Sequence, residues 1–339
     1  MNALVCVTGV SGFVGSAIAR DLLAHGYRVR GTARAPEGAL IHLRSLPGAD
    51  DLLEVVAADL DKPESLDRAV AGCDYLIHAA SPYVLTVNDP QRDLVDPAVQ
   101  GTLSVLSAAR SAQTVTRVVV TSSFAAITDE PDGTFDETHW NETSSLKRNP
   151  YYFSKVAAER AAWDFAARKP GFDLVSINPS LVIGPSLVPS LNVSNQVLAD
   201  FTTNRYPGIL DLAWGLVDIR DVATAHRLAL EVQSASGRYL CTADVWTMRQ
   251  IVDLAKESDL GLRRLPSLSL DTAWGRALVR VASTFQPSGS RDFLRTNLGR
   301  RFRIDTTRIR TDLGMKFRPP GNSIVDAYRD LRRWGHIKA

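Results

Sequence analysis

The chain has 339 residues, of which 45% are hydrophobic and 22% charged, enough for one large or two closely packed globular domains. Its formal net charge of +2 gives no field that would favour nucleic acid or a membrane surface. Cys6, Cys73 and Cys241 are too far apart in the sequence for a disulfide framework or a CxxC zinc site, so we expect a reducing, cytoplasmic compartment.

Short apolar runs alternate with helical patterns through the first half of the chain. Strands are predicted at residues 3–8, 27–34, 52–59, 74–81, 117–123 and 173–179, with helices at 16–26, 63–70 and 97–110 and another near 149. Strands that alternate with helices predict a parallel, doubly wound α/β sheet of the Rossmann type. A strand that begins by residue 3 leaves no room for a leader peptide, and no apolar run is long enough to span a membrane.

After Pro179 this alternation becomes less regular. Proline- and serine-rich stretches at 185–197 and 277–292 separate short elements, which predicts a smaller and irregular second lobe. The unit at 215–230 is expected to return to the large sheet. We therefore expect a dinucleotide-binding domain of residues 1–179, joined again by 212–241, and a substrate-binding lobe of 180–211 and 242–339.

A glycine-rich turn joins the first predicted strand to the first helix. The sequence TGVSGFVG has a GxxGxxG spacing rather than the commoner GxGxxG. Glycine permits a tight turn, close approach of the backbone to a pyrophosphate, and close packing of the helix on the sheet. The positive end of the helix then faces the phosphates, whereas an ordinary strand–helix turn is the weaker interpretation. The predicted phosphate site comprises Gly9, Ser11, Gly12, Phe13, Val14 and Gly15.

The end of the second predicted strand discriminates between NADP and NAD. NAD sites usually carry an acid about 20 residues after the glycines, where it binds the ribose 2′-hydroxyl. Arg34 stands at that position, and a guanidinium pairs with a 2′-phosphate that a carboxylate would repel. We predict NADP(H). The alternative is that Arg34 is only a surface charge, and the nearby Glu37 favours NAD.

Residues after the later strands extend the predicted cofactor surface. Asp59 is placed to meet an adenine amino group, and the small residues of HAAS (78–81) leave room for the cofactor backbone. The residues assigned by position are Asp59, Leu60, Ala79, Ala80, Ser81 and Thr121.

The stretch NPYYFSKVAAER (149–160) carries two tyrosines close to one lysine. On an ideal helix, residues four apart differ in direction by about 40° and residues three apart by about 60°, so Tyr151 and Tyr152 both lie near Lys155, with Tyr151 slightly better aligned. An ammonium lowers the pKa of a neighbouring phenol, and a hydroxyl from VVVTSS can hold a carbonyl. Packing is the alternative, but the order of glycine turn, Ser-Ser strand end and Tyr/Lys helix favours chemistry.

These residues resemble those of the extended short-chain dehydrogenases/reductases, and within them the dihydroflavonol reductase, cinnamoyl-CoA reductase and yeast methylglyoxal or carbonyl reductase group. The resemblance covers nearly the whole chain, in segments such as TGVSGFVGSAIARDLLAHGYRVRGTAR, RVVVTSSFAAI, YYFSKVAAERAAWDF and VDIRDVATAH. It implies that Tyr151 is the acid, that Lys155 tunes it and holds the ribose, and that Ser123 orients the carbonyl, with Ser122 serving the strand end.

The same resemblance implies further cofactor residues. Arg34 corresponds to the family's 2′-phosphate ligand, while a second basic residue that is usual in the family has no match in APEGALIH. The other implied cofactor residues are Pro179, Ser180, Leu181, Val182 and Ser194.

Two positions depart from the specialised members of the group. Dihydroflavonol reductases tend to carry asparagine where this chain has Thr128, and cinnamoyl-CoA reductases tend to carry tryptophan where it has Pro150. The resemblance therefore implies a generalist aldehyde or ketone reductase. The candidates for an apolar substrate pocket, with core packing as the default for each, are Pro82, Phe124, Thr128, Tyr152, Val188, Phe201 and Tyr206.

Other functions remain as alternatives. A hydroxysteroid dehydrogenase would differ only in pocket shape, Arg34 argues against a sugar-nucleotide epimerase or dehydratase, and a cofactor-sensing binding protein would commonly lack the Tyr/Lys pair. We expect a monomer or homodimer that acts on a small molecule, without nucleic acid, membrane or metal, because the six histidines are scattered. The acidic stretch 129–140 and the arginine-rich stretch 295–314 are expected to be solvated or partner-facing surfaces.

Overall fold

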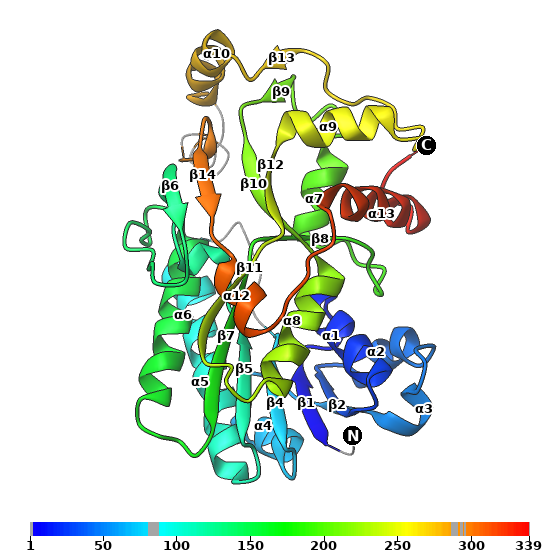
Figure 1. Ribbon diagram of the computed structural model, residues 1–339, viewed down its shortest axis with the longest axis vertical. Helices are drawn as coiled ribbons and strands as arrows, with labels where there is room; N and C mark the ends of the chain where they lie inside the picture. Colours follow the sequence, from blue (N-terminus) through cyan, green and yellow to red (C-terminus); the bar gives the residue numbers. More distant parts are fainter. Residues whose placement is uncertain (1–2, 81–87, 286–290, 292–293, 295, 339) are drawn as a thin grey trace.

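Figure 1 shows a computed structural model of the protein, which describes residues 3–80, 88–285, 291, 294 and 296–338. A large parallel sheet forms the lower half of the protein in this view. Within these residues the sheet has seven strands in the order β11-β7-β5-β4-β1-β2-β3, and all neighbours are parallel. This confirms the predicted doubly wound α/β fold. The strands are β1 (Leu4–Thr8), β2 (Arg28–Ala33), β3 (Leu53–Ala57), β4 (Tyr75–His78), β5 (Arg117–Thr121), β7 (Asp173–Pro179) and β11 (Gly237–Cys241).

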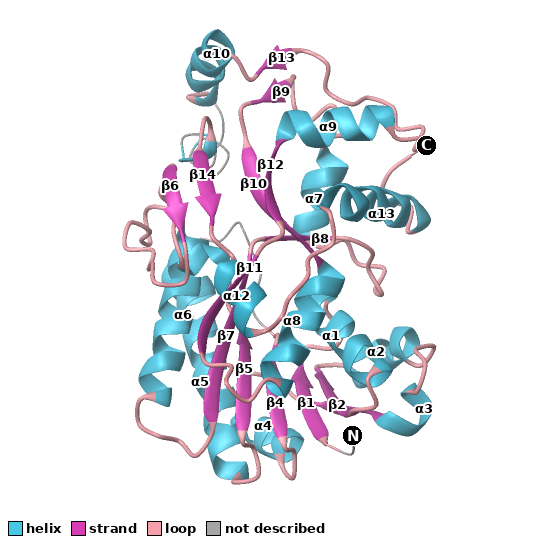
Figure 2. Cartoon of the chain, in the orientation of Figure 1, coloured by secondary structure: helices cyan, strands magenta, loops and turns pink. Residues whose placement is uncertain are grey.

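Helices cover both faces of this sheet (Figure 2). Alternate residues of a strand point to opposite faces. Accordingly, Val5 and Val7 pack in a cluster with residues of α1 (Phe13–Ala24) and α8 (Ile219–Glu231), while Leu4 and Cys6 pack with α4 (Pro63–Val70), α5 (Asp96–Ala112) and α6 (Pro150–Ala166). All five residues of β1 are buried, which is why this strand reads as an uninterrupted apolar run. The short helices α2 (Pro36–Leu43) and α3 (Ala49–Leu52) lie between β2 and β3.

A second lobe lies beyond the carboxyl ends of the strands (Figure 1). It contains a three-stranded sheet of β8 (Leu181–Ile183), β10 (Ala213–Asp218) and β12 (Asp244–Thr247). Its own core includes Phe201, Met248, Ile251 and Tyr328. The surrounding elements are α7 (Val193–Asp200), β9 (Ile209–Leu210), α9 (Met248–Glu257), β13 (Ser269–Leu270), α10 (Ala273–Ser283), α12 (Thr307–Asp312) and α13 (Pro320–Arg333).

The unit at 215–230 packs on the large sheet through its helix and through Val217, which shares a core cluster with Val7 and Ile177. Helix α8 packs against α1, but β10 pairs with β8 and β12 instead of joining the large sheet. The strand that closes the large sheet is β11, which pairs with β7. Apolar periodicity shows that a segment is a strand but not which neighbour it pairs with. The unit therefore returns to the large sheet through α8, while its strand β10 pairs in the smaller sheet. The division into domains at these boundaries stays a prediction.

The acidic and arginine-rich stretches meet each other. Residues of the acidic stretch form β6 (Asp132–Phe135), which pairs in parallel with β14 (Arg301–Ile304). The Arg301 amide donates to the Asp132 carboxylate at 3.1 Å. Most of β6 is exposed, as expected of a solvated stretch, but it also pairs with a strand that is distant in the sequence.

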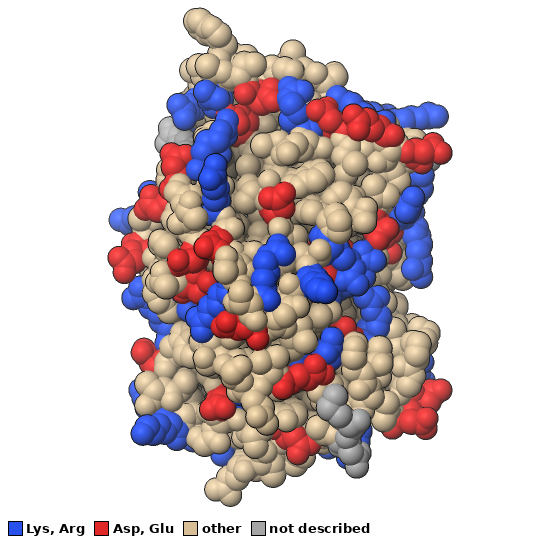
Figure 3. Space-filling view, in the orientation of Figure 1, with Lys and Arg blue, Asp and Glu red and all other residues tan. Residues whose placement is uncertain are grey.

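The outer surface carries both signs of charge. Acidic and basic side chains are interspersed over the face shown in Figure 3. No helix in the described part of the chain combines the length and the apolar character needed to cross a bilayer.

Candidate active site

The glycine turn between β1 and α1 is closely packed. Gly9 has φ +74°, and a Cβ on it would lie 3.0 Å from Ala80. A Cβ on Gly15 would collide with the carbonyl group of Gly9, so the first turn of α1 rests directly on the loop. Gly12 precedes α1 and offers no side chain to cap its amides. These amides and the bare backbone fit a phosphate group, which a side chain at any of the three glycines would disturb.

A hydroxyl network fixes the adjoining strand end. The Thr8 Oγ1 accepts from the amides of Ala79 and Ala80, both at 3.1 Å, and therefore uses its own proton to reach His78 Nδ1 at 2.9 Å. Burial, and then the charge of Lys155, lower the pKa of His78 to about 4, which keeps the imidazole neutral. Sequence reasoning missed this role of Thr8. The predicted Ser81 and Pro82 lie outside the described residues.

The adenosine end of the predicted cofactor surface follows β2 and β3. Arg34 is exposed immediately after β2. Asp59 lies in the turn after β3, where its amide donates to Ser65 Oγ at 3.0 Å, and Leu60 packs against Gly101 of α5. Because β2 pairs with β1 and β3 pairs with β2, all in parallel, these residues share the edge that carries the glycine turn.

Helix α6 brings the tyrosines and the lysine together. Lys155 is buried, and its Nζ lies 5.5 Å from the centroid of the Tyr151 ring. Burial lowers the pKa of this lysine to about 8, so the ammonium remains the main form at neutral pH. Tyr152 packs edge-on against Tyr151, at 6.1 Å between ring centroids, and its hydroxyl interacts with Arg300. Burial raises the pKa of Tyr152.

The residues that end β5 have different partners. Ser123 is half-buried, and its Oγ accepts from the Ala125 amide at 3.1 Å at the start of the short helix η2 (Phe124–Ala126). The Ser122 Oγ donates to Glu159 at 2.5 Å. The Thr121 hydroxyl lies 2.8 Å from Nε2 of His226 on α8. Burial lowers the pKa of that histidine to about 4.

The orientation of the His226 ring follows from its other contact. Its Nδ1 lies 2.7 Å from the carbonyl of Val222, which can only accept, so Nδ1 carries the proton of the neutral ring. Thr121 must therefore donate to Nε2. The hydroxyl that we assigned to the cofactor surface thus contacts α8 in this structure.

Two buried hydroxyls lie where β7 and β11 leave the sheet. Pro179 and Cys241 are paired in the last register position of these strands, and Ser180 and Thr242 follow them. Within the described residues, the hydroxyl oxygens of both are buried and have no hydrogen-bond partner. Unpaired buried hydroxyls at a carboxyl edge suit a ligand between the lobes. Sequence reasoning named Ser180 but missed Thr242. Leu181 and Val182 lie in β8, and the half-buried Ser194 lies in the first turn of α7.

The proposed pocket residues are mostly packed inside the protein. Phe124 stacks on Phe302 with 5.7 Å between centroids, and Phe201 is fully buried against Tyr206 and Trp214. These are the packing roles that we weighed against a pocket. The other two candidates, Thr128 and Val188, are also buried.

The order of glycine turn, strand-end serines and Tyr/Lys helix along a doubly wound sheet is that of the extended short-chain dehydrogenases/reductases, a class of oxidoreductases. The chain belongs to the NAD dependent epimerase/dehydratase family, whose model matches residues 5–241. The resemblance inferred from the motifs is therefore confirmed.

Individual relatives are reductases. The chain is 35% identical to cinnamoyl-CoA reductase 1 of Arabidopsis thaliana, over 98% of this chain and 90% of that protein. It is 37% identical to tetraketide alpha-pyrone reductase 1 of the same plant, over 98% and 96%. The crystal structure of yeast methylglyoxal/isovaleraldehyde reductase complexed with NADPH superposes with a TM-score of 0.79 at 27% identity, over 99% of this chain and 100% of that one. The protein is thus a reductase of the extended class.

Proposed function

We propose that the protein reduces an aldehyde or ketone with NADPH, and that the same residues catalyse the reverse oxidation of an alcohol. The observation that carries the proposal is the buried ammonium of Lys155 against the ring of Tyr151. A positive charge beside a phenol favours the ionised form, and so makes proton transfer from the phenol easier near neutral pH. Tyr152 also has a cation beside it, Arg300, but burial has the larger effect and raises its pKa.

Each residue has a distinct task in this proposal. Bound NADPH, present in the structure of the yeast relative, would supply the hydride. Tyr151 donates its hydroxyl proton to the oxygen that becomes an alkoxide, and Lys155 stabilises the phenolate that remains. Ser123 donates a hydrogen bond to the same carbonyl oxygen and orients it. The glycine turn holds the pyrophosphate with backbone amides, and Arg34 pairs with the 2′-phosphate.

The substrate is proposed to be a small or broadly accepted carbonyl compound. The names of the relatives refer to a CoA thioester, a pyrone and small aldehydes. Membership of the family therefore does not select one of these substrates. Thr128 and Pro150 replace residues typical of the dihydroflavonol and cinnamoyl-CoA specialists. A generalist reductase fits both observations.

A substrate panel tests this function. Purified protein should oxidise NADPH, followed by absorbance, when given aldehydes or ketones. It should be inactive or much slower with ketosteroids, sugar nucleotides and cinnamoyl-CoA. Turnover of a sugar nucleotide without net NADPH consumption would instead identify an epimerase, and nucleotide binding without any turnover would identify a sensing protein.

Cofactor preference provides a separate prediction. Arg34→Ala should raise the KM for NADPH by about 10- to 100-fold, the loss expected for one charge-assisted hydrogen bond, and leave the KM for NADH nearly unchanged. The matched control is Glu37→Gln, also exposed on the same segment, which should change neither value much. A native protein that prefers NADH, or an NADH affinity that depends on Glu37, would refute the role of Arg34.

A further inference from the structure

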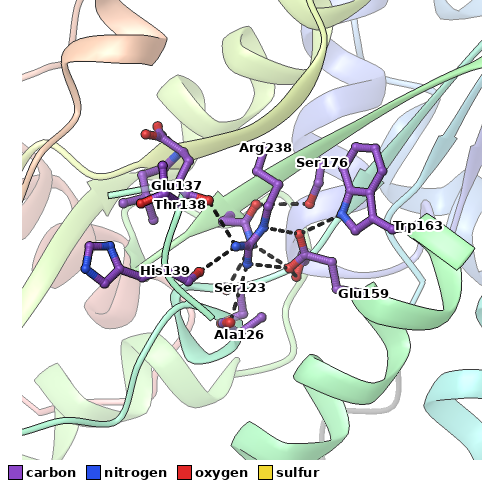
Figure 4. Close-up of polar contacts among 12 residues, drawn as sticks. Ser123, Ala126, Glu137, Thr138, His139, Glu159, Trp163, Ser176 and Arg238 are labelled. Carbon is purple, nitrogen blue, oxygen red and sulfur yellow. Dashed lines mark hydrogen bonds and ion pairs between the residues drawn. The ribbon is translucent and has the colours of Figure 1, made fainter. Parts of the chain in front are cut away.

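A buried carboxylate lies one helical turn beyond Lys155 on α6. Glu159 is only 3% exposed, and its oxygens accept from Ser122 Oγ at 2.5 Å and from Asn178 Nδ2 at 2.7 Å. Trp163 Nε1 donates from the next turn at 3.3 Å, and Arg238 Nε donates from β11 at 2.7 Å (Figure 4). Four donors, one just after β5, one each in β7 and β11 and one on α6, therefore converge on a single side chain that the proposed chemistry does not use.

Arg238 extends this cluster to the loop that covers it. Besides Glu159, its guanidinium donates to the carbonyls of Glu137 and His139, at 3.1 and 2.6 Å, and more distantly to the carbonyl of Ala126. The guanidinium also lies over the ring of Trp140, 3.8 Å from its centroid. Figure 4 shows Glu137, His139, Ala126 and Glu159 around the Arg238 side chain. The arginine thus links α6 to the last residue of the short helix η2 and to the loop at 137–140.

The hydrogen bonds of Glu159 and Arg238 involve residues on both sides of Ser123 in the sequence. Ser122, which precedes it, donates to Glu159, and Asn178 bridges Glu159 to the Ser123 carbonyl at 3.2 Å. Ala126, which ends η2, accepts from Arg238. Tyr151 and Lys155 lie on the same helix as Glu159, two turns and one turn earlier. This buried pair therefore links the segment that carries Ser123 to the helix that carries Tyr151.

A second anchor holds the start of the same helix. Asp129, which is fully buried, accepts from Asn149 Nδ2 at 2.7 Å, and Asn149 immediately precedes α6. The segment 122–129 is thereby tied to α6 at both ends, with Ser123 and Tyr151 between the two ties. Loss of the Glu159 contacts should leave the hydrogen bond between Asp129 and Asn149 in place. The start of α6 would then remain attached while the segment at Ser123 moves.

We propose that Glu159 and Arg238 are positioning residues that set the Ser123 hydroxyl against the Tyr151 hydroxyl, and that this buried ion pair serves turnover rather than stability. This inference rests on the proposed reductase function. Its physical basis is that a buried ion pair costs so much desolvation that apolar or neutral replacement of both partners is often neutral or stabilising, whereas removal of one partner is strongly destabilising. Stability and positioning therefore respond differently to single and double replacement.

The test compares Glu159→Gln, Arg238→Met and the double variant with the native protein. Each single variant should melt at a lower temperature. The double variant should recover most of the melting temperature but keep a kcat lower by on the order of 10- to 100-fold, as expected for a slightly misplaced catalytic group. The affinity for NADPH, measured by fluorescence titration, should remain within about twofold of native. Recovery of kcat together with the melting temperature would overturn the proposal.

Ser122→Ala is a milder variant that decides the question even if Glu159 variants do not fold. It removes one hydrogen bond between the serine strand end and Glu159, and should lower kcat several-fold with NADPH affinity unchanged; an unchanged kcat would overturn the proposal. The matched control for Arg238→Met is Arg117→Met, because Arg117 is a similarly buried arginine at the opposite end of β5, bound to carbonyls at the end of α8. It should lower the melting temperature without lowering kcat. A native protein inactive on the whole substrate panel would refute the proposed function instead.

Discussion

Replacing Tyr151 with phenylalanine should lower kcat by about 10³-fold or more while leaving the affinity for NADPH nearly unchanged. The ring would still occupy its place against Lys155 and Tyr152, so the loss would come from the missing proton alone. The measurement is steady-state oxidation of NADPH with the best substrate of the panel, together with a direct titration of NADPH binding.

Tyr152→Phe is the matched control for this experiment. It removes the same atom from the neighbouring ring, whose hydroxyl interacts with Arg300 and whose pKa is raised by burial. It should lose far less activity than the Tyr151 variant. Undiminished turnover by Tyr151→Phe, or a larger loss in the Tyr152 variant, would reverse the assignment of the acid.

Replacing Lys155 with methionine should abolish turnover and weaken NADPH binding, yet make the protein more stable near neutral pH. Burial lowers the pKa of Lys155 from 10.5 to about 8. Since one pKa unit corresponds to about 1.4 kcal/mol, the buried charge costs on the order of 3 kcal/mol of folding free energy, which methionine of similar shape would not carry. Thermal melting and denaturant titration of the two proteins measure this difference.

The pH dependence of that difference has a defined sign. Between pH 8 and 10.5 the unfolded chain binds more protons at this lysine than the folded chain, so native stability rises with pH through that window. The advantage of Lys155→Met should therefore be complete below pH 8 and disappear by about pH 10.5. A variant less stable than the native protein at pH 7 would show that the lysine's contacts outweigh the cost of burying its charge.

The candidate site was only partly predictable from local sequence. Spacing along one helix placed Lys155 near both tyrosines, and the family resemblance chose Tyr151; the observed contacts of Lys155 with Tyr151 and of Tyr152 with Arg300 agree with that choice without testing it. The pocket was harder to predict, because a buried phenylalanine such as Phe201 and a ligand-lining one have the same apolar signature. Thr8 and Thr242 were missed because a single threonine at a strand end carries no pattern.

What the sequence by itself determined is what depends on near neighbours in the chain: the alternation of strands and helices, the glycine turn and the spacing of tyrosine and lysine. These features follow from backbone sterics and helical geometry over a few residues. Only the tertiary structure decided which strands pair and which buried charges meet. It joined β6 to β14, and it brought Glu159 of α6 to Arg238 of β11. Such contacts follow from the packing of whole elements, because burial forces distant polar groups to find partners that no local pattern specifies.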